Sequence, residues 1–205
     1  MKSVKLILAH GAGAGSQSDF MQSICNKVTE FTKKQMKENV EVILFDFPYM
    51  QQIHATGKKR PPDKMAKLVA AFEQQVGQVS ADDIIFVAGK SMGARVALET
   101  ILASNRTINA AIALGYPFYP PGKAEKHRLE LLQKTTAPCL IIQGERDTFG
   151  NRDWVEQQAL SNNIQINWIT AADHSLKPLK SSGVSHEQAL DSASHAIVKF
   201  IKAHV

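Results

Sequence analysis

Six short, nearly continuous apolar runs recur along the chain, and longer segments with helical spacing separate them. Runs rich in Val, Ile and Leu are typical of strands that are covered on both faces. Their alternation with helical segments predicts an α/β fold, a mainly parallel six-stranded sheet with helices on both faces and no large cap. The predicted strands are residues 4–9, 41–47, 84–88, 110–114, 139–143 and 164–169.

The segments between these runs carry apolar stripes that suit the inner faces of helices. Ser185 and Gln188 have the spacing of a capping box at the start of the last predicted helix. With 205 residues and no repeat or linker, the chain is expected to form a single domain over residues 1–205. Two longer irregular stretches, residues 49–64 and 116–127, follow the second and fourth strands. They begin at the carboxyl edge of the sheet, where open α/β sheets bind ligands.

Charge and composition narrow the classes of function. The formal net charge is +5, but the basic residues are scattered, which is typical of a solvated surface and predicts no nucleic-acid partner. The run Lys58-Lys59-Arg60 is the exception and remains a candidate site for an anionic group. No apolar stretch approaches the ~20 residues that a membrane span needs. Cys25 and Cys139 lie in apolar stretches, as reduced thiols do, so we expect a cytoplasmic protein that does not associate with membranes.

The most informative run covers residues 84–98 and reads strand, Gly-x-Ser-x-Gly, helix. Gly89 and Gly93 stand two residues before and two residues after Ser91. Small residues at these positions let the strand and the helix approach closely, so the serine hydroxyl projects above the sheet edge at a helix N-terminus. A serine that only caps the helix is the alternative. The apolar strand before it and the small-residue helix after it favour a nucleophile.

A serine hydroxyl is a weak nucleophile near neutral pH and needs a base, which an acid must orient. When the nucleophile stands on a turn of this kind, an Asp or Glu and then a His follow it along the chain. Asp147 follows the fifth strand in a Gly-x-x-Asp turn, and Glu145 in the same turn is the competing acid. His174 lies in the loop between the last strand and the last helix and is the predicted base.

The glycine-rich run after the first strand has two interpretations. In the first, the backbone N–H groups of Ala12 and Met92 form an oxyanion hole. In the second, the run is a dinucleotide-binding turn, and Asp46 at the end of the second strand binds the ribose. The second interpretation needs glycine or alanine where Ser16 or Ser18 stands. It also leaves the Gly-x-Ser-x-Gly run unexplained, so the first is favoured.

Together these motifs resemble the α/β-hydrolase superfamily over nearly the whole chain, and most closely its small dienelactone-hydrolase-like branch without a separate lid domain. Residues 115–123, 143–150 and 172–175 further resemble little-characterised predicted hydrolases of the animal testis-expressed protein 30 type. That group also includes a subunit of a histone acetyltransferase complex. The chain departs from the superfamily pattern because it begins at the strand that normally comes third. It also has a serine where dienelactone hydrolases typically use a cysteine.

The resemblance implies a triad of Ser91, Asp147 and His174 with no metal and no organic cofactor. The predicted activity is cleavage of an ester or related acyl bond in a small-molecule substrate by a serine hydrolase. A non-catalytic interaction domain with the same architecture is the alternative from another class. The natural substrate and the oligomeric state stay open. Aromatic residues near the expected catalytic edge predict an apolar pocket. The pocket candidates are Tyr49, Tyr116, Phe118, Tyr119 and Phe149.

Overall fold

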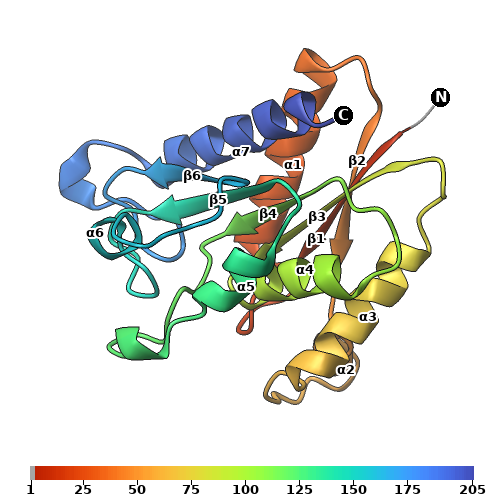
Figure 1. Ribbon diagram of the computed structural model, residues 1–205, viewed down its shortest axis with the longest axis horizontal. Helices are drawn as coiled ribbons and strands as arrows, with labels where there is room; N and C mark the ends of the chain where they lie inside the picture. Colours follow the sequence, from red (N-terminus) through yellow and green to blue (C-terminus); the bar gives the residue numbers. More distant parts are fainter. Residues whose placement is uncertain (1–2) are drawn as a thin grey trace.

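The computed structural model describes residues 3–205, which form a six-stranded sheet between two layers of helices (Figure 1). The strand order is β2-β1-β3-β4-β5-β6, and every pairing between neighbouring strands in this sheet is parallel. The predicted α/β architecture is therefore confirmed. The strands are β1 (Val4–Ala9), β2 (Val40–Phe45), β3 (Ile84–Lys90), β4 (Ala110–Leu114), β5 (Cys139–Gly144) and β6 (Ile164–Ile169).

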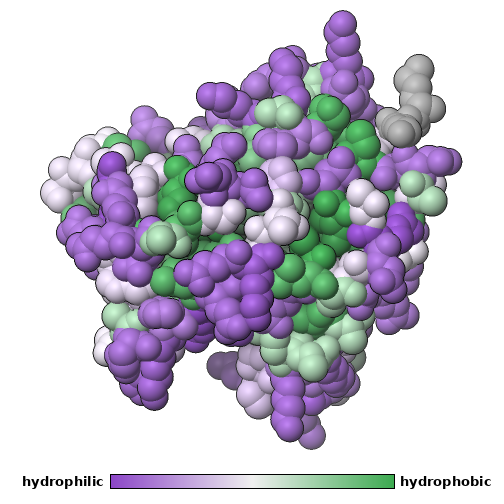
Figure 2. Space-filling model, in the orientation of Figure 1, coloured by the Kyte–Doolittle hydropathy of each residue, from purple (hydrophilic) through white to green (hydrophobic). Residues whose placement is uncertain are grey.

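Each face of the sheet is covered by its own set of helices. Helices α1 (Asp19–Gln35) and α7 (His186–Ala203) lie side by side on one face. The other face carries α2 (Pro48–Thr56), α3 (Met65–Gly77), α4 (Met92–Ala103) and α5 (Leu129–Lys134), with the short α6 (Arg152–Val155) near its edge. Two short 3₁₀ helices, Ala124–Lys126 and Lys180–Ser182, lie in the connections. Hydrophilic residues cover much of the visible surface, and hydrophobic ones show between them (Figure 2).

The core consists of two apolar clusters separated by the sheet. Successive strand side chains point to opposite faces, so Leu6 and Leu8 pack under α1 and α7 while Ile7 packs on the α3–α4 side. Most strand residues of β1, β3, β4 and β5 are buried because helices cover both sides. This explains why these runs are nearly continuous in apolar residues rather than alternating.

One segment differs from the sequence-based expectation, and one helix start confirms it. Residues 49–64 were expected to be irregular, but their first part belongs to helix α2. Pro48 stands at the start of this helix, where its fixed φ suits the first turn, and Gly57 ends it at φ 67°. The capping box at Ser185 and Gln188 is confirmed, with both reciprocal hydrogen bonds present.

The turn from β3 into α4 brings the strand and the helix into very close contact. A Cβ atom added to Gly89 would lie 2.1 Å from the carbonyl carbon of Gly93, and one added to Gly93 would lie 2.6 Å from the carbonyl oxygen of Ala9. Both obstacles are backbone atoms, which cannot rotate away. The two glycines of the Gly-x-Ser-x-Gly run are therefore required by packing, as their spacing predicts.

Gly89→Ala is expected to lower the free energy of unfolding by about 3 kcal/mol or more, because the new methyl group overlaps the backbone of α4. Gly77→Ala is the matched control, since no atom lies within 4 Å of a Cβ added at that helical glycine. The control is expected to raise stability by about 0.5 kcal/mol through reduced freedom of the unfolded chain. Urea unfolding followed by circular dichroism measures both. Equal stabilities for the two variants would contradict the tight junction.

Candidate active site

Ser91 occupies the turn between β3 and α4 in a backbone conformation that L residues rarely adopt, with φ 52° and ψ −108°. Such a conformation costs on the order of 1–3 kcal/mol and persists only where the surroundings impose it. Here the close approach of Gly89 and Gly93 imposes it. The strain lifts the serine side chain above the carboxyl edge of the sheet, at the positive end of the α4 dipole.

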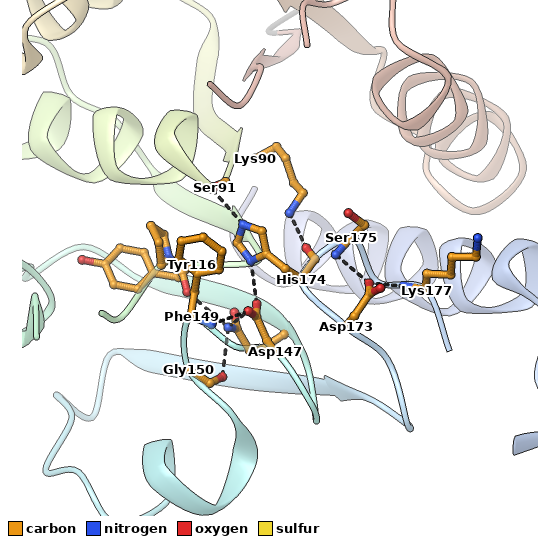
Figure 3. Close-up of polar contacts among 12 residues, drawn as sticks. Lys90, Ser91, Tyr116, Asp147, Phe149, Gly150, Asp173, His174, Ser175 and Lys177 are labelled. Carbon is orange, nitrogen blue, oxygen red and sulfur yellow. Dashed lines mark hydrogen bonds and ion pairs between the residues drawn. The ribbon is translucent and has the colours of Figure 1, made fainter. Parts of the chain in front are cut away.

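A line of hydrogen bonds joins Ser91, His174 and Asp147 (Figure 3). The Oγ of Ser91 lies 2.9 Å from Nε2 of His174, and Nδ1 of His174 lies 2.8 Å from Oδ2 of Asp147. A carboxylate can only accept, so Nδ1 carries the proton of the neutral imidazole and Nε2 accepts from the serine hydroxyl. The structure thus brings together the three residues that the sequence placed after three different strands.

Asp147 is fully buried, and its carboxylate is held by N–H donors on both oxygens. Besides His174, the side-chain amide of Gln143 donates to Oδ2 at 2.8 Å, and the backbone N–H of Phe149 donates to Oδ1 at 2.8 Å. These bonds compensate for the loss of water around the charge. They also fix which oxygen faces the histidine.

Glu145, the competing acid, points elsewhere. Its Oε1 lies 2.9 Å from Nη1 of Arg152, and its Oε2 accepts from the backbone N–H of Ala171 at 2.8 Å. It therefore braces the loop that leads to His174 without contacting the imidazole.

His174 is held from two sides. The ring of Phe149 stacks on its imidazole, with centroids 4.2 Å apart. The loop around it contains two non-glycine residues with positive φ, Ala171 and Leu176, so its path is fixed by specific contacts. A Cβ added to Gly144 would lie 2.3 Å from the carbonyl oxygen of Asp173. The loop therefore packs directly on the end of β5.

The glycine-rich loop after β1 lies against the Ser91 turn. A Cβ added to Gly11 would lie 3.7 Å from Cβ of Ser91 and 3.5 Å from the carbonyl oxygen of Lys90. Within residues 3–205, neither the N–H of Ala12 nor that of Met92 donates to a protein acceptor. Both donors are therefore available to an oxygen atom bound beside Ser91.

Two buried side chains, Tyr49 and His10, hold the glycine-rich loop through hydrogen bonds to its carbonyl oxygens. The Tyr49 hydroxyl donates to the carbonyl oxygen of Ala12 at 3.0 Å, and the fully buried His10 donates from Nδ1 to the carbonyl oxygen of Gly11 at 2.6 Å. Burial lowers the pKa of His10, and its Nε2 accepts from the backbone N–H of Phe47 at 3.2 Å. His10 is thus a neutral residue that holds the loop in place.

Asp46, the residue on which the dinucleotide interpretation depended, is already engaged. Its two carboxylate oxygens accept from the backbone N–H and from the hydroxyl of Ser16, each at 2.7 Å. The carboxylate closes the glycine-rich loop instead of facing a ribose, so the structure contradicts that alternative. No group of three or more His, Cys, Asp or Glu side chains suited to a metal ion occurs in the described residues.

A cavity of about 510 Å³ opens beside Ser91. Its walls come from the glycine-rich loop, from Phe20 and Met21 at the start of α1, from Phe149, and from the loop that carries His174. The aromatic side of the cavity is therefore built partly by α1, on the face of the sheet opposite to α3 and α4.

Of the five aromatic residues predicted to form the pocket, only Phe149 lines this cavity. The prediction is wrong for Tyr49, Tyr116 and Phe118, which are fully buried, and for Tyr119, which is 7% exposed. These rings belong to the apolar cluster under the loops. The physical reason is that a ring buries a large apolar area, so the loops at this edge use the rings as anchors to the core.

Three residues of the site were missed by reasoning from the sequence. Gln143 is the next-to-last residue of the buried strand β5, and a polar side chain in such a run is the signal that could have found it. Phe20 stands at the start of α1, where an apolar residue suits a core-facing position, but it lines the cavity. Lys90 stands inside the Gly-x-Ser-x-Gly run, yet it was treated only as a variable position of the motif.

The remaining predicted features lie apart from this site. Lys58, Lys59 and Arg60 are exposed and line a separate shallow hollow. Cys25 and Cys139 are both free thiols, and burial raises the pKa of Cys139 to about 12, so its thiol stays protonated. Among the helices of residues 3–205, none is both long enough and apolar enough to cross a membrane.

Comparison with solved structures finds the same architecture in several proteins of other organisms. A serine hydrolase homologue from Coxiella burnetii is 18% identical with a TM-score of 0.65, covering 97% of this chain and 85% of its own. A dienelactone hydrolase from Anabaena variabilis is 17% identical with a TM-score of 0.69, covering 100% and 88%. Est1E from Butyrivibrio proteoclasticus is 15% identical with a TM-score of 0.70, covering 99% and 88%. At these identities the likeness shows a shared fold.

Comparison with protein families shows more than a shared fold. The sequence model that describes an alpha/beta hydrolase domain matches residues 2–202, almost the whole chain. The matched range contains the Ser91 turn, Asp147 and His174, which are joined by hydrogen bonds. The chain therefore belongs to the alpha/beta hydrolase family.

Proposed function

We propose that this chain, acting as a single domain, is a serine hydrolase that cleaves an ester or a related acyl bond in a small molecule. The observation that carries the proposal is the unbroken line of hydrogen bonds from Ser91 Oγ through His174 to the buried Asp147. It begins at a strained serine, and strain of this kind is retained where it serves a mechanism.

The chemistry follows from the protonation states that these contacts set. Ser91 Oγ attacks the acyl carbon while its proton passes to Nε2 of His174, and the carbonyl oxygen takes the negative charge. Asp147 stabilises the imidazolium and holds its orientation. The imidazolium then gives its proton to the departing alkoxide, so an alcohol leaves and an acyl-serine remains. A water molecule repeats the sequence and releases the carboxylic acid.

The negative charge on the carbonyl oxygen needs donors that are already in position. The N–H groups of Ala12 and Met92 are the proposed pair, since neither is used by another acceptor in the described chain. Each donor of this kind contributes on the order of 10²–10³ in rate. The Tyr49 hydroxyl, which holds the Ala12 carbonyl, keeps the first donor in place.

A non-catalytic interaction domain is the competing function. It gains nothing from the strained φ of Ser91, from the buried carboxylate of Asp147, or from a cavity that meets the serine hydroxyl. The solved neighbours include a dienelactone hydrolase and an esterase domain from Rhodothermus marinus, which favours carboxylic esters as the substrate class. The resemblance to the testis-expressed protein 30 type is consistent with this class and adds no substrate.

A fluorophosphonate probe tests the proposal directly, because it phosphonylates only an activated serine. The probe is expected to label the folded protein once, on the peptide that contains Ser91, and heat denaturation is expected to abolish labelling. Mass spectrometry of the digested protein locates the modification. Absence of labelling in the folded protein, or labelling spread over surface serines, would contradict a serine hydrolase.

A further inference from the structure

Lys90 is the one residue of the Gly-x-Ser-x-Gly run for which the proposed reaction has no use. It ends β3 directly before Ser91, and its side chain lines the same cavity as Ser91 and His174. Figure 3 shows the side chain running alongside the His174 loop, with its Nζ directed at the His174 carbonyl oxygen. An amine that carries a positive charge when protonated therefore lies beside the reacting groups.

The ammonium of Lys90 has fewer partners than a largely buried cation requires. Nζ donates to the His174 carbonyl oxygen and lies 5.5 Å from the centroid of the Phe20 ring. Within residues 3–205, no carboxylate lies within 4.0 Å of it. Burial lowers the pKa of Lys90 to about 8, and the more distant carboxylates of Asp147 and Asp173 only partly oppose this. An ammonium that donates up to three hydrogen bonds thus lacks a counter-ion.

Other charged groups of the cavity do not supply the missing partner. Asp19 lines the cavity but is exposed and makes no ion pair with Lys90. His186 also lines it, and its Nε2 contacts the carbonyl oxygen of Ser175 at 3.2 Å. The remaining wall is largely apolar, with Phe20, Met21 and Phe149. A ligand group that enters this cavity meets hydrophobic surface and one unpaired cation.

We propose that the acyl group of the substrate carries a carboxylate, and that Lys90 binds it. This inference rests on the proposed serine hydrolase function and names its substrate class, monoesters of short dicarboxylic acids. Lys90 and Ser91 are adjacent residues that line the same cavity, so the second carboxylate is expected to lie a short distance from the ester. A single cation suits a monovalent carboxylate better than a phosphate dianion, which would need more donors.

A positioning role for Lys90 makes a different prediction. If its bond to the His174 carbonyl only held the base in place, a change at Lys90 would slow charged and neutral esters by the same factor. If Lys90 instead binds a carboxylate, a change at Lys90 slows the charged ester more than the neutral one. The ratio of kcat/KM for a charged and a neutral ester of equal length therefore separates these roles, whatever happens to the absolute rates.

The test compares monoethyl glutarate with ethyl pentanoate, with the released acid measured by chromatography. The native protein is expected to favour the charged ester by about 10-fold or more, and Lys90→Met is expected to remove that preference. Lys177→Met is the matched control, since Lys177 is an exposed cation three residues after His174 that does not line the cavity. It is expected to leave the ratio unchanged.

A preference that survives in Lys90→Met, or that is absent from the native protein, overturns the inference. If only ethyl pentanoate is hydrolysed, the proposed carboxylate specificity is wrong but the hydrolase function stands. If neither ester is hydrolysed and the probe does not label Ser91, the hydrolase function itself is wrong. Protection of Ser91 from the fluorophosphonate probe needs no variant. Glutarate is expected to protect at concentrations about 10-fold or more below those of uncharged glutaramide. Equal protection by the two contradicts the proposal even if Lys90→Met does not fold.

Discussion

Replacing Ser91 with alanine is expected to lower ester hydrolysis by up to about 10⁶-fold, which corresponds to about 8 kcal/mol of transition-state stabilisation. The change removes the only hydroxyl within hydrogen-bond distance of His174 Nε2 in the described residues, so no acyl-serine can form. Alanine also removes the Oγ without filling space, and the turn is set by Gly89 and Gly93. The fold is therefore expected to remain intact.

Steady-state kinetics with p-nitrophenyl butyrate, beside circular dichroism of the same samples, measures this effect. Ser104→Ala is the matched control, because Ser104 stands at the far end of α4 and its hydroxyl only accepts from the backbone N–H of Arg106. The control is expected to keep full activity. A folded Ser91→Ala protein that retains most of the activity would rule out the proposed nucleophile.

Asp147→Asn is expected to lower turnover by about 10⁴-fold, the largest effect after that of the nucleophile. The buried carboxylate accepts from Nδ1 of His174 and so keeps Nε2 free to take the serine proton. In asparagine one carboxylate oxygen becomes an NH₂ group. With the remaining oxygen held by the Phe149 N–H at the Oδ1 position, this NH₂ group lies at the Oδ2 position and directs its hydrogens at the ring. The histidine then adopts the other tautomer, with its proton on Nε2.

Glu145→Gln is the matched control, two residues away in the same turn. Glu145 pairs with Arg152 and holds the Ala171 N–H, so its loss is expected to lower stability by about 1 kcal/mol and turnover by a few-fold at most. Pre-steady-state release of p-nitrophenol from both variants measures the acylation step. A Glu145 variant slower than the Asp147 variant would show that the acid has been assigned to the wrong residue.

The strands illustrate what local pattern can determine. Strands buried on both faces read as continuous apolar runs, and β1 and β4 begin and end where those runs do. The edge strand β6 is only partly buried, and it also keeps its predicted bounds. The second run was expected to continue through Phe47, but the strand ends at Phe45 because Pro48 starts a helix. Both outcomes can be read from neighbouring residues. The bounds of the apolar runs reflect the burial of the strands, and the early end of β2 reflects the proline ring, which fixes φ at the start of the next helix.

The pocket aromatics show where local pattern fails. The sequence predicts that Tyr116 and Phe118 follow the end of β4, close to the catalytic edge of the sheet. It does not predict whether their rings point toward the cavity or toward the core. The rings turn inward, because burying a ring against the core gains more free energy than exposing it at a cavity rim. Phe20 shows the opposite outcome, because it is an apolar residue at the start of a helix that packs on the core, yet it lines the cavity.

By itself, the sequence determined the fold class and the serine turn, because the strand and helix patterns and the Gly-x-Ser-x-Gly run each depend on residues within a few positions of one another. Only the tertiary structure showed that Asp147, and not Glu145, contacts His174, since both residues follow β5 and differ in which partner lies across the loop. It also decided that Asp46 closes a loop and that Lys90 faces a cavity without a counter-ion. Such outcomes depend on where segments more than 25 residues apart meet, and contacts of that range are set by the packing of the whole sheet.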